Sequence, residues 1–441
     1  MSRAVSRVAA ALFLFLFAPA RADMDARTTA DFDPAAFTWA YGLVIDTLSV
    51  SGNDRTQSMA LLREMESRVG ARLERSKLER DYRYLSDLSS IATVGVNVYP
   101  VREGYCGLEL RVTERPPVFL KLIYPILEYD FNSDRWRYGL RVNDRNFRRR
   151  LETLSAGYTR NSVDDDRASV GWGTRWIGWQ HIGLSGAFSY YKRGGTPATL
   201  SVVEQSRVVI GGSLPLTESR MSFSQVIARL SATKNRLGGV SLPSSDEILM
   251  SPSLGFNLDR RDSQFKPTRG GVFGVDVQSN RVVNGSGSTY YQLGNDLRIF
   301  RSVLPHTVLA LQSNLAYQFG KFPEYIRFGM GGAGTLRGYA NGEFEGAHRW
   351  FQSAELRVAP FPTWLFSVPY ARSVDVTVAG TLFVDTGIVW DCEKNFTSER
   401  WHGGYGFGFI VYSPFQDVAR VELGFNRLGH VHFYFSTGIR F

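Results

Sequence analysis

Three charged side chains in the C-terminal part of the chain have types and spacing that favour an ion-pair cluster. Arg337 lies in a long stretch, residues 321–349, that has no strand pattern, and Glu355 and Asp385 lie in the two alternating segments that follow. Both acids share the parity of small or polar neighbours, so both should face the same side of a sheet. A guanidinium is a planar fork that suits carboxylates better than lysine does. We therefore expect Arg337 to bind both acids, and a solvated charge pair is the alternative.

The sequence lacks the residue patterns of common enzymes. It has no Gly-x-Ser-x-Gly and no Walker phosphate-binding loop. Its six histidines do not show metal-ligand spacing, and two cysteines are too few for a disulfide framework or a zinc ribbon. The net charge of +9 is weak evidence for nucleic-acid binding. We predict a non-enzymatic protein with no metal, no cofactor and no nucleic-acid partner. A basic cluster at Arg145 and residues 148–150 should be a solvated rim, with contact to anionic lipid headgroups as the alternative.

Alternation with a period of two residues dominates residues 118–441. Val170, Trp172 and Trp176, for example, fall on an apolar parity, and Arg420 and Glu422 fall on the polar parity of a later segment. Isolated charges among glycines, strand after strand, are typical of a wide, wet barrel interior whose outer face meets lipid. We predict a 16-stranded antiparallel transmembrane β-barrel, closed because lipid cannot satisfy a sheet edge. A soluble β-sandwich is the alternative. The expected strands begin near residues 119, 135, 151, 167, 181, 202, 221, 248, 271, 290, 307, 350, 376, 404, 417 and 430.

Residues 1–22 have the three parts of a secretory signal peptide. Arg3 and Arg7 precede an apolar run over residues 8–19, and Ala20-Arg21-Ala22 is a small-x-small cleavage site. The apolar run is too short for a stable membrane-spanning helix, which disfavours the alternative of an uncleaved anchor. Residues 23–38 are polar and are expected to form a flexible leader.

Residues 39–117 predict a small α+β domain with the order β-α-α-β-β. Strand composition is followed by two amphipathic helices, the first capped by Thr56, and then by two alternating segments that a turn separates. The apolar helix faces predict ordinary core packing. The expected strands cover residues 43–50, 93–100 and 106–114, and the second helix covers residues 76–88.

This organisation and several motifs resemble the BamA/TamA superfamily of outer-membrane assembly and translocation proteins (bacterial surface antigen type). Residues 39–117, with Val50-Ser-Gly-Asn53 after the first strand and Val112-Thr-Glu-Arg-Pro-Pro117 at the end, resemble the periplasmic POTRA domain of that family. Leu336-Arg337-Gly338-Tyr339 matches the [VL]-R-G-[FY] tip of the family's loop inside the barrel. The resemblance implies that Arg337, Gly338 and Tyr339 fix this loop to Glu355 and Asp385 on the following two strands.

Other motifs extend the resemblance over about residues 40–441. Residues 383–391 look like the family's strand 13, and residues 258–262 with 265–270 look like its periplasmic turn before strand 9. The chain ends on an aromatic strand that resembles the signal by which outer-membrane barrels are recognised for insertion. The residues of this signal are Phe433, Phe435, Gly438, Ile439 and Phe441.

The resemblance implies a protein of the bacterial outer membrane with its POTRA domain in the periplasm. Such a protein would insert or translocate polypeptides without a nucleotide, through a barrel that opens laterally. Its partners would be unfolded polypeptide clients, outer-membrane lipid and periplasmic accessory proteins. The sequence departs from the family in showing one POTRA unit where several are usual. A dedicated secretion pore for one partner protein or for lipid, and a passive diffusion channel, remain as alternatives.

Overall fold

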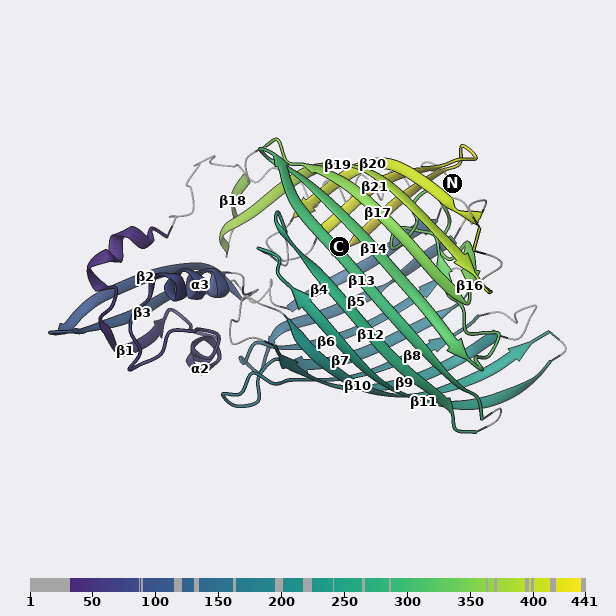
Figure 1. The fold of residues 1–441 in the computed structure, drawn as a ribbon, viewed down its shortest axis with the longest axis horizontal. Helices are drawn as coiled ribbons and strands as arrows, with labels where there is room; N and C mark the ends of the chain where they lie inside the picture. Colours follow the sequence, from purple (N-terminus) through teal and green to yellow (C-terminus); the bar gives the residue numbers. More distant parts are fainter. Residues whose placement is uncertain are drawn as a thin grey trace.

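A computed structural model gives the structure of the chain in two parts, a small N-terminal domain and a large β-sheet that curls into a barrel (Figure 1). Among the residues that the structure describes, none belongs to a helix long and apolar enough to cross a membrane. The expected signal peptide lies outside the described residues. These are residues 32–86, 88, 90–114, 121–130, 135–161, 164–194, 201–216, 224–240, 242–263, 266–284, 287–361, 364–368, 371–392, 396–397, 400–412 and 418–437.

The N-terminal domain is a three-stranded sheet covered by helices. Its sheet order is β1-β3-β2, with β1 parallel to β3 and β2 antiparallel to β3. Buried apolar side chains from the sheet and both α-helices form one core, which includes Ile45, Leu61, Leu78 and Leu110. The segment order agrees with the expected β-α-α-β-β. The elements are η1 (Pro34–Ala40), β1 (Val44–Ser51), α2 (Ser58–Leu62), α3 (Arg75–Ser86), β2 (Ile91–Arg102) and β3 (Tyr105–Glu114).

Two details of this domain differ from the sequence-based prediction. The first helix is a single turn that follows Gln57, and Thr56 does not cap it. The Thr56 hydroxyl instead accepts a hydrogen bond from the Asn146 side chain at 2.9 Å, far along the chain. In the expected leader, η1 begins at Pro34, and Phe37 within it packs against the domain core. Apolar contact therefore orders the last residues of a segment that composition alone assigns to a leader.

Asp81 on α3 ties the helix to the preceding loop. Its buried carboxylate accepts hydrogen bonds from the backbone N–H groups of Glu66 at 2.5 Å and Ser67 at 3.0 Å. Burial raises the pKa of Asp81, and these N–H donors oppose that rise. Asp81→Ala would leave both donors without this acceptor, at about 1–3 kcal/mol for each buried group.

We expect Asp81→Ala to lower the urea concentration at which the N-terminal domain of the full-length protein becomes sensitive to protease. Glu79→Ala on the same helix is the matched control, because the Glu79–Arg75 pair is a surface salt bridge with little net effect on stability. Equal shifts for the two variants would contradict the role of Asp81.

The large sheet follows the chain in antiparallel pairs, with β17 pairing with β19 across the short strand β18. The observed strand starts lie close to the expected ones. Its strands are β4 (Lys121–Asp130), β5 (Arg135–Phe147), β6 (Glu152–Asn161), β7 (Asp166–Thr174), β8 (Gly183–Lys192), β9 (Ser201–Pro215), β10 (Gln225–Gly239), β11 (Leu242–Asp259), β12 (Gly270–Val282), β13 (Thr289–Leu304), β14 (Thr307–Gly320), β17 (His348–Val358), β18 (Trp364–Val368), β19 (Ala371–Trp390), β20 (His402–Tyr412), β21 (Val418–Asn426) and β22 (Val431–Thr437).

The sheet order returns from β22 to β4. Over the described residues, the neighbours along the rest of the wall have a register of paired residues, with β17 pairing directly with β19, and none is present for β22 with β4. We call the boundary between β22 and β4 the seam. Over the described residues no ladder of paired residues closes the sheet there, although the lipid argument predicts closure. Over the described residues, the short strand β18 has a register with the first residues of β19 alone, and it is absent from the sequence-based strand set.

Side chains on the apolar parity point out of the barrel. Val170, Leu254 and Phe407 are among the exposed ones, in agreement with the predicted alternation. Trp176 is the exception, because the sequence pattern assigns it to the lipid face whereas its side chain is buried. It lies after the end of β7, in a turn that contacts the N-terminal domain.

That turn forms a junction between the N-terminal domain and the barrel. The indole N–H of Trp176 donates to the Glu64 carboxylate at 2.7 Å, and Arg175 donates to the same oxygen at 3.3 Å. In the turn between β5 and β6, Arg149 donates to the backbone carbonyls of Asp54 and Arg55. The prediction of a purely solvated basic rim is therefore wrong for Arg149, which binds the domain instead.

Trp176→Phe should loosen this junction. The change keeps an aromatic ring but removes the N–H that donates to the buried Glu64 carboxylate. A buried charge needs such hydrogen-bond donors. We expect a broader distribution of distances between spin labels on the N-terminal domain and the barrel. Trp179→Phe is the matched control in the same turn, because Trp179 is 58% exposed. Identical distance distributions in both variants would show that the Glu64–Trp176 contact does not hold the domain.

Candidate functional site

The long connection between β14 and β17 folds into the barrel interior. We call residues 321–347 the inner loop. It contains a small hairpin of β15 (Phe328–Met330) and β16 (Phe344–Gly346), which the sequence pattern does not predict. Buried Met330, Leu336 and Tyr339 pack with Phe351 of β17. This apolar cluster positions the loop tip, Leu336–Tyr339, against the inner wall.

Arg337 at the tip is fully buried and contacts three carboxylates. Its Nε and Nη2 atoms donate to the two oxygens of Asp385 at 2.7 and 2.8 Å. Its Nη1 atom donates to Glu355 at 3.0 Å and to Glu422 at 2.6 Å. The backbone N–H of Arg337 also donates to Asp385 at 3.0 Å. The structure thus brings together the three residues whose spacing suggests an ion-pair cluster, and it adds a third acid.

The three acids come from different strands of the wall. Glu355 lies on β17, Asp385 on β19 and Glu422 on β21. Two more arginines complete the group, since Arg357 donates to Glu355 at 2.7 Å and Arg420 donates to both glutamates at 2.5 and 3.0 Å. Three buried cations therefore face three buried anions, which meets the condition that charges away from water be paired. We call these six residues the charge cluster.

Further contacts fix the orientation of the Arg337 side chain. Its guanidinium lies 3.3 Å from the ring centroid of Phe383, a cation–π arrangement. Ser353 accepts a hydrogen bond from Arg337 at 3.2 Å and donates one to Asp385 at 2.6 Å. Because the guanidinium is held on its edge and on its face, a side chain of different shape cannot make the same contacts.

Glycines in the wall and in the loop allow the tip to lie flat on the strands. A Cβ atom at Gly404 of β20 would lie 1.8 Å from the Arg337 carbonyl oxygen. Gly338 has φ +96°, and a Cβ there would lie 2.5 Å from the Phe425 carbonyl oxygen. A glycine at this position therefore permits close approach of the loop backbone to the wall. Tyr339, the next residue, donates from its hydroxyl to the Gly403 carbonyl at 3.2 Å.

Sequence reasoning missed Glu422, Arg420 and Arg357. A signal was present, because Arg420 and Glu422 share the polar parity of their strand. Parity shows that a side chain faces the interior, but not how deep the loop reaches or which wall it meets.

In the expected C-terminal signal, Phe433 and Phe435 are exposed on the outer face. Gly438, Ile439 and Phe441 lie outside the described residues.

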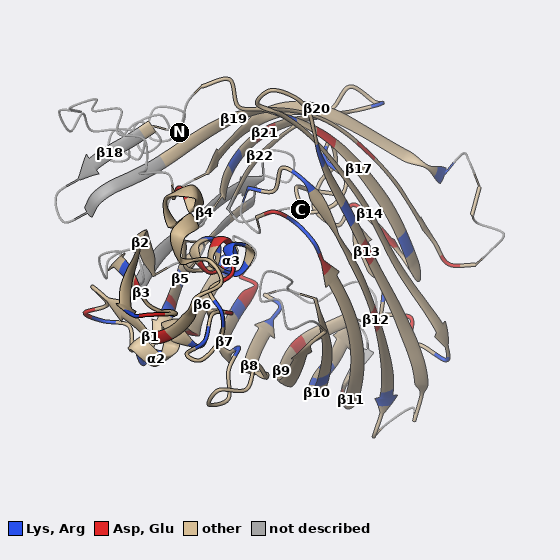
Figure 2. Ribbon diagram, turned by 60° about the vertical axis from the view of Figure 1, so that its left-hand side comes forward, with Lys and Arg blue, Asp and Glu red and all other residues tan. Residues whose placement is uncertain are grey.

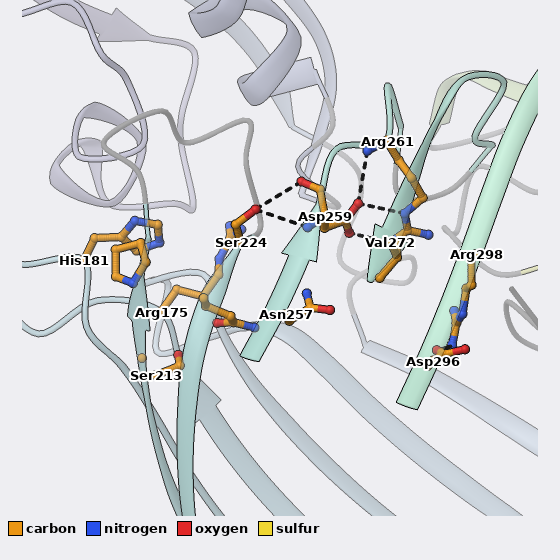
Figure 3. Close-up of a pocket in the computed structure, with 13 residues that line it drawn as sticks. Arg175, His181, Ser213, Ser224, Asn257, Asp259, Arg261, Val272, Asp296 and Arg298 are labelled. Atoms are coloured by element: carbon orange, nitrogen blue, oxygen red, sulfur yellow. Dashed lines mark hydrogen bonds and ion pairs between the residues drawn. The ribbon is translucent and has the colours of Figure 1, made fainter. Parts of the chain in front are cut away.

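A second polar region opens near the barrel end that faces the N-terminal domain. It is a cavity of about 520 Å³ (Figure 3) whose lining includes Arg175 and His181. Its arginines have acidic partners, with Arg261 bound to Asp259 at 2.7 Å and Arg298 bound to Asp296 at 2.6 Å. Charges of both signs are spread along the strands (Figure 2). This mixed lining is that of a wetted passage, and it differs from the buried charge cluster.

The comparison with protein-family models gives one match that covers most of the chain. The model of the Omp85 superfamily domain matches residues 131–441. The chain belongs to the Omp85 superfamily. The resemblance drawn from the sequence motifs is therefore confirmed at the level of the family, and with it the location of the protein in the bacterial outer membrane.

Individual relatives agree with this Omp85 assignment. The chain is 27% identical over 197 residues to the outer membrane protein assembly factor BamA of Neisseria meningitidis serogroup B, a match that covers 39% of this chain and 23% of that protein. The chain thus matches less than a quarter of that relative's length.

Solved structures show the same fold. BamA from Haemophilus ducreyi lacking POTRA domains 1–3 has a TM-score of 0.56 at 18% identity, with 90% of this chain and 84% of that chain covered. CdiB from Acinetobacter baumannii has a TM-score of 0.61 at 14% identity, with 89% and 73% covered.

Proposed function

We propose that this protein assembles or translocates polypeptides at the bacterial outer membrane, without an enzymatic step. Membership in the Omp85 superfamily and the similarity to an assembly factor support this proposal. The observation that carries it is the inner loop, which a buried charge cluster holds across β17, β19 and β21. An open diffusion channel has no need of a loop fixed by three buried ion pairs across its interior.

We also propose that the barrel has 16 strands and that the N-terminal domain is a single POTRA domain within this chain. β4–β14, β17 and β19–β22 supply this strand count if β18 is an extension that pairs only with β19. The β-α-α-β-β order and the mixed β1-β3-β2 sheet support the POTRA assignment.

The edge strand β2 of this domain is the proposed client-binding strand. The other edge strand, β1, is covered by residues 70–73, whose backbone bonds to Leu43 and Ile45. Over the described residues, β2 pairs with β3 alone. A sheet edge with free N–H and C=O groups can accept an extended polypeptide as a further strand. Unfolded clients would therefore pair with β2.

The seam between β22 and β4 is the proposed lateral opening towards lipid. Over the described residues, β22 pairs with β21 along residues 419–425, and no register of paired residues joins β22 to β4. Opening where few ladder hydrogen bonds join two strands breaks few bonds. The inner loop, bound to the wall beside this seam, would keep the two sides in register. Periplasmic accessory proteins would dock on the N-terminal domain.

Depletion of the protein, followed by quantitative proteomics of the outer membrane, tests the function. We expect a broad fall in other β-barrel proteins. The loss of one exported protein or of one lipid, with other barrels intact, would instead identify a dedicated transporter. An unchanged outer membrane together with a large steady conductance of the purified protein would identify a diffusion channel and contradict the proposal.

A further inference from the structure

The last described strand of the barrel contacts the inner loop through the hydroxyl group of Tyr434. Tyr434 on β22 accepts hydrogen bonds from the backbone N–H groups of Gly338 at 2.9 Å and Tyr339 at 3.2 Å. The same hydroxyl donates to the Tyr339 carbonyl at 2.8 Å. A phenol hydroxyl has one proton and two lone pairs, so these three contacts use its full capacity.

The position of Tyr434 links this contact to the charge cluster. In the register of β21 with β22, Tyr434 lies directly opposite Glu422, the acid that accepts from Arg337 at 2.6 Å. A Cβ atom at Gly424 would lie 2.6 Å from the Gly338 nitrogen and 3.1 Å from the Tyr434 ring, so the glycine makes room for both. The loop tip, β21 and β22 therefore form one packed unit.

The two attachments of the loop tip differ in kind. The charge cluster joins the tip to β17, β19 and β21 by charged hydrogen bonds, which are roughly twice as strong as neutral ones. The Tyr434 hydroxyl joins the tip to β22 by neutral hydrogen bonds, each worth about 0.5–1.5 kcal/mol in net terms. If β22 moves away from the loop, the neutral contacts break and the buried charges stay paired.

We propose that Tyr434 is the positioning residue that couples the inner loop to the seam strand and that it releases β22 when the seam opens. This inference rests on the proposed lateral opening between β22 and β4. The charge cluster is then the fixed part of the loop attachment, and the hydrogen bonds of the Tyr434 hydroxyl are the part that releases.

Tyr434→Phe in the full-length protein in lipid nanodiscs tests this coupling by hydrogen exchange. The change removes only the hydroxyl, and we expect exchange of the β22 amides and of the Gly338 and Tyr339 amides to rise roughly tenfold, the size of about one lost hydrogen bond. Exchange in β19 and β10 should not change. Tyr405→Phe on β20 is the matched control, because its ring points outward and is 56% exposed.

Two results would overturn the coupling. Unchanged exchange in β22 would show that the hydroxyl does not hold the strand. A uniform rise over the whole barrel would show that Tyr434 stabilises the fold in general. Because exchange reports the contact itself, either result is independent of the depletion experiment, which tests whether the protein assembles or translocates polypeptides.

Discussion

Arg337→Met is expected to release the inner loop from the wall and to abolish function while the barrel still forms. The change leaves three buried carboxylates facing two arginines, so one buried negative charge loses its partner. Breaking a buried ion pair by removing one partner costs about 3–5 kcal/mol, which is more than a hundredfold in the docked population of the loop. Arg337→Lys keeps the charge but not the fork, and it should lose most of the docked state too.

External protease cleavage of the inner loop in intact cells measures this release. We expect rapid cleavage within residues 321–347 in both Arg337 variants and slow cleavage in the unaltered protein. Arg327→Lys is the matched control in the same loop, because the Arg327–Asp391 pair lies at the surface, where ion pairs contribute about 0–1 kcal/mol. Slow cleavage in Arg337→Met would show that the charge cluster does not hold the loop.

Gly404→Ala is expected to have a comparably large effect through shape rather than charge. The added methyl group would lie 1.8 Å from the Arg337 carbonyl oxygen, a distance at which the loop backbone must move. Overpacking in a well-packed region costs about 1–3 kcal/mol or more. Displacement of the tip would carry Arg337 away from Glu355, Asp385 and Glu422 and would clear the interior of the barrel.

Uptake of large hydrophilic antibiotics measures that clearance. We expect cells with Gly404→Ala to become sensitive to them, and cells with Gly403→Ala to remain resistant. The control is the adjacent residue, where a Cβ atom would meet no other atom within 4 Å. Equal resistance in both strains would mean that the tip tolerates displacement or does not block the interior.

The strands could be predicted from the sequence because each one carries its own alternation. Residues such as Val170 and Leu254 meet lipid or solvent whatever the neighbouring strands do, so local parity determines their side. Trp176 departs from this rule because it lies past the end of the strand. There Glu64 of the N-terminal domain accepts a hydrogen bond from its indole N–H. A contact of this kind depends on tertiary structure and leaves no local periodic signal.

The charge cluster could be predicted only in part. Glu355 and Asp385 can be predicted because they follow the loop on the next strands of the chain. Glu422 and Arg420 lie much later, and their contact with the loop depends on barrel curvature and on the depth of the loop tip. The single helical turn of α2 and the hairpin of β15 and β16 are likewise determined by packing rather than by periodicity.

Complementation of depleted cells by Arg337→Lys, with the outer-membrane proteome as the readout, tests whether the charge cluster is needed for function. Heat-modifiable migration in gel electrophoresis would first show that Arg337→Lys and Arg327→Lys reach the outer membrane folded and in equal amounts. We expect Arg327→Lys to restore the other β-barrel proteins and Arg337→Lys to fail to restore them. Full restoration by Arg337→Lys would contradict the claim that the charge cluster and its inner loop are required for polypeptide assembly or translocation.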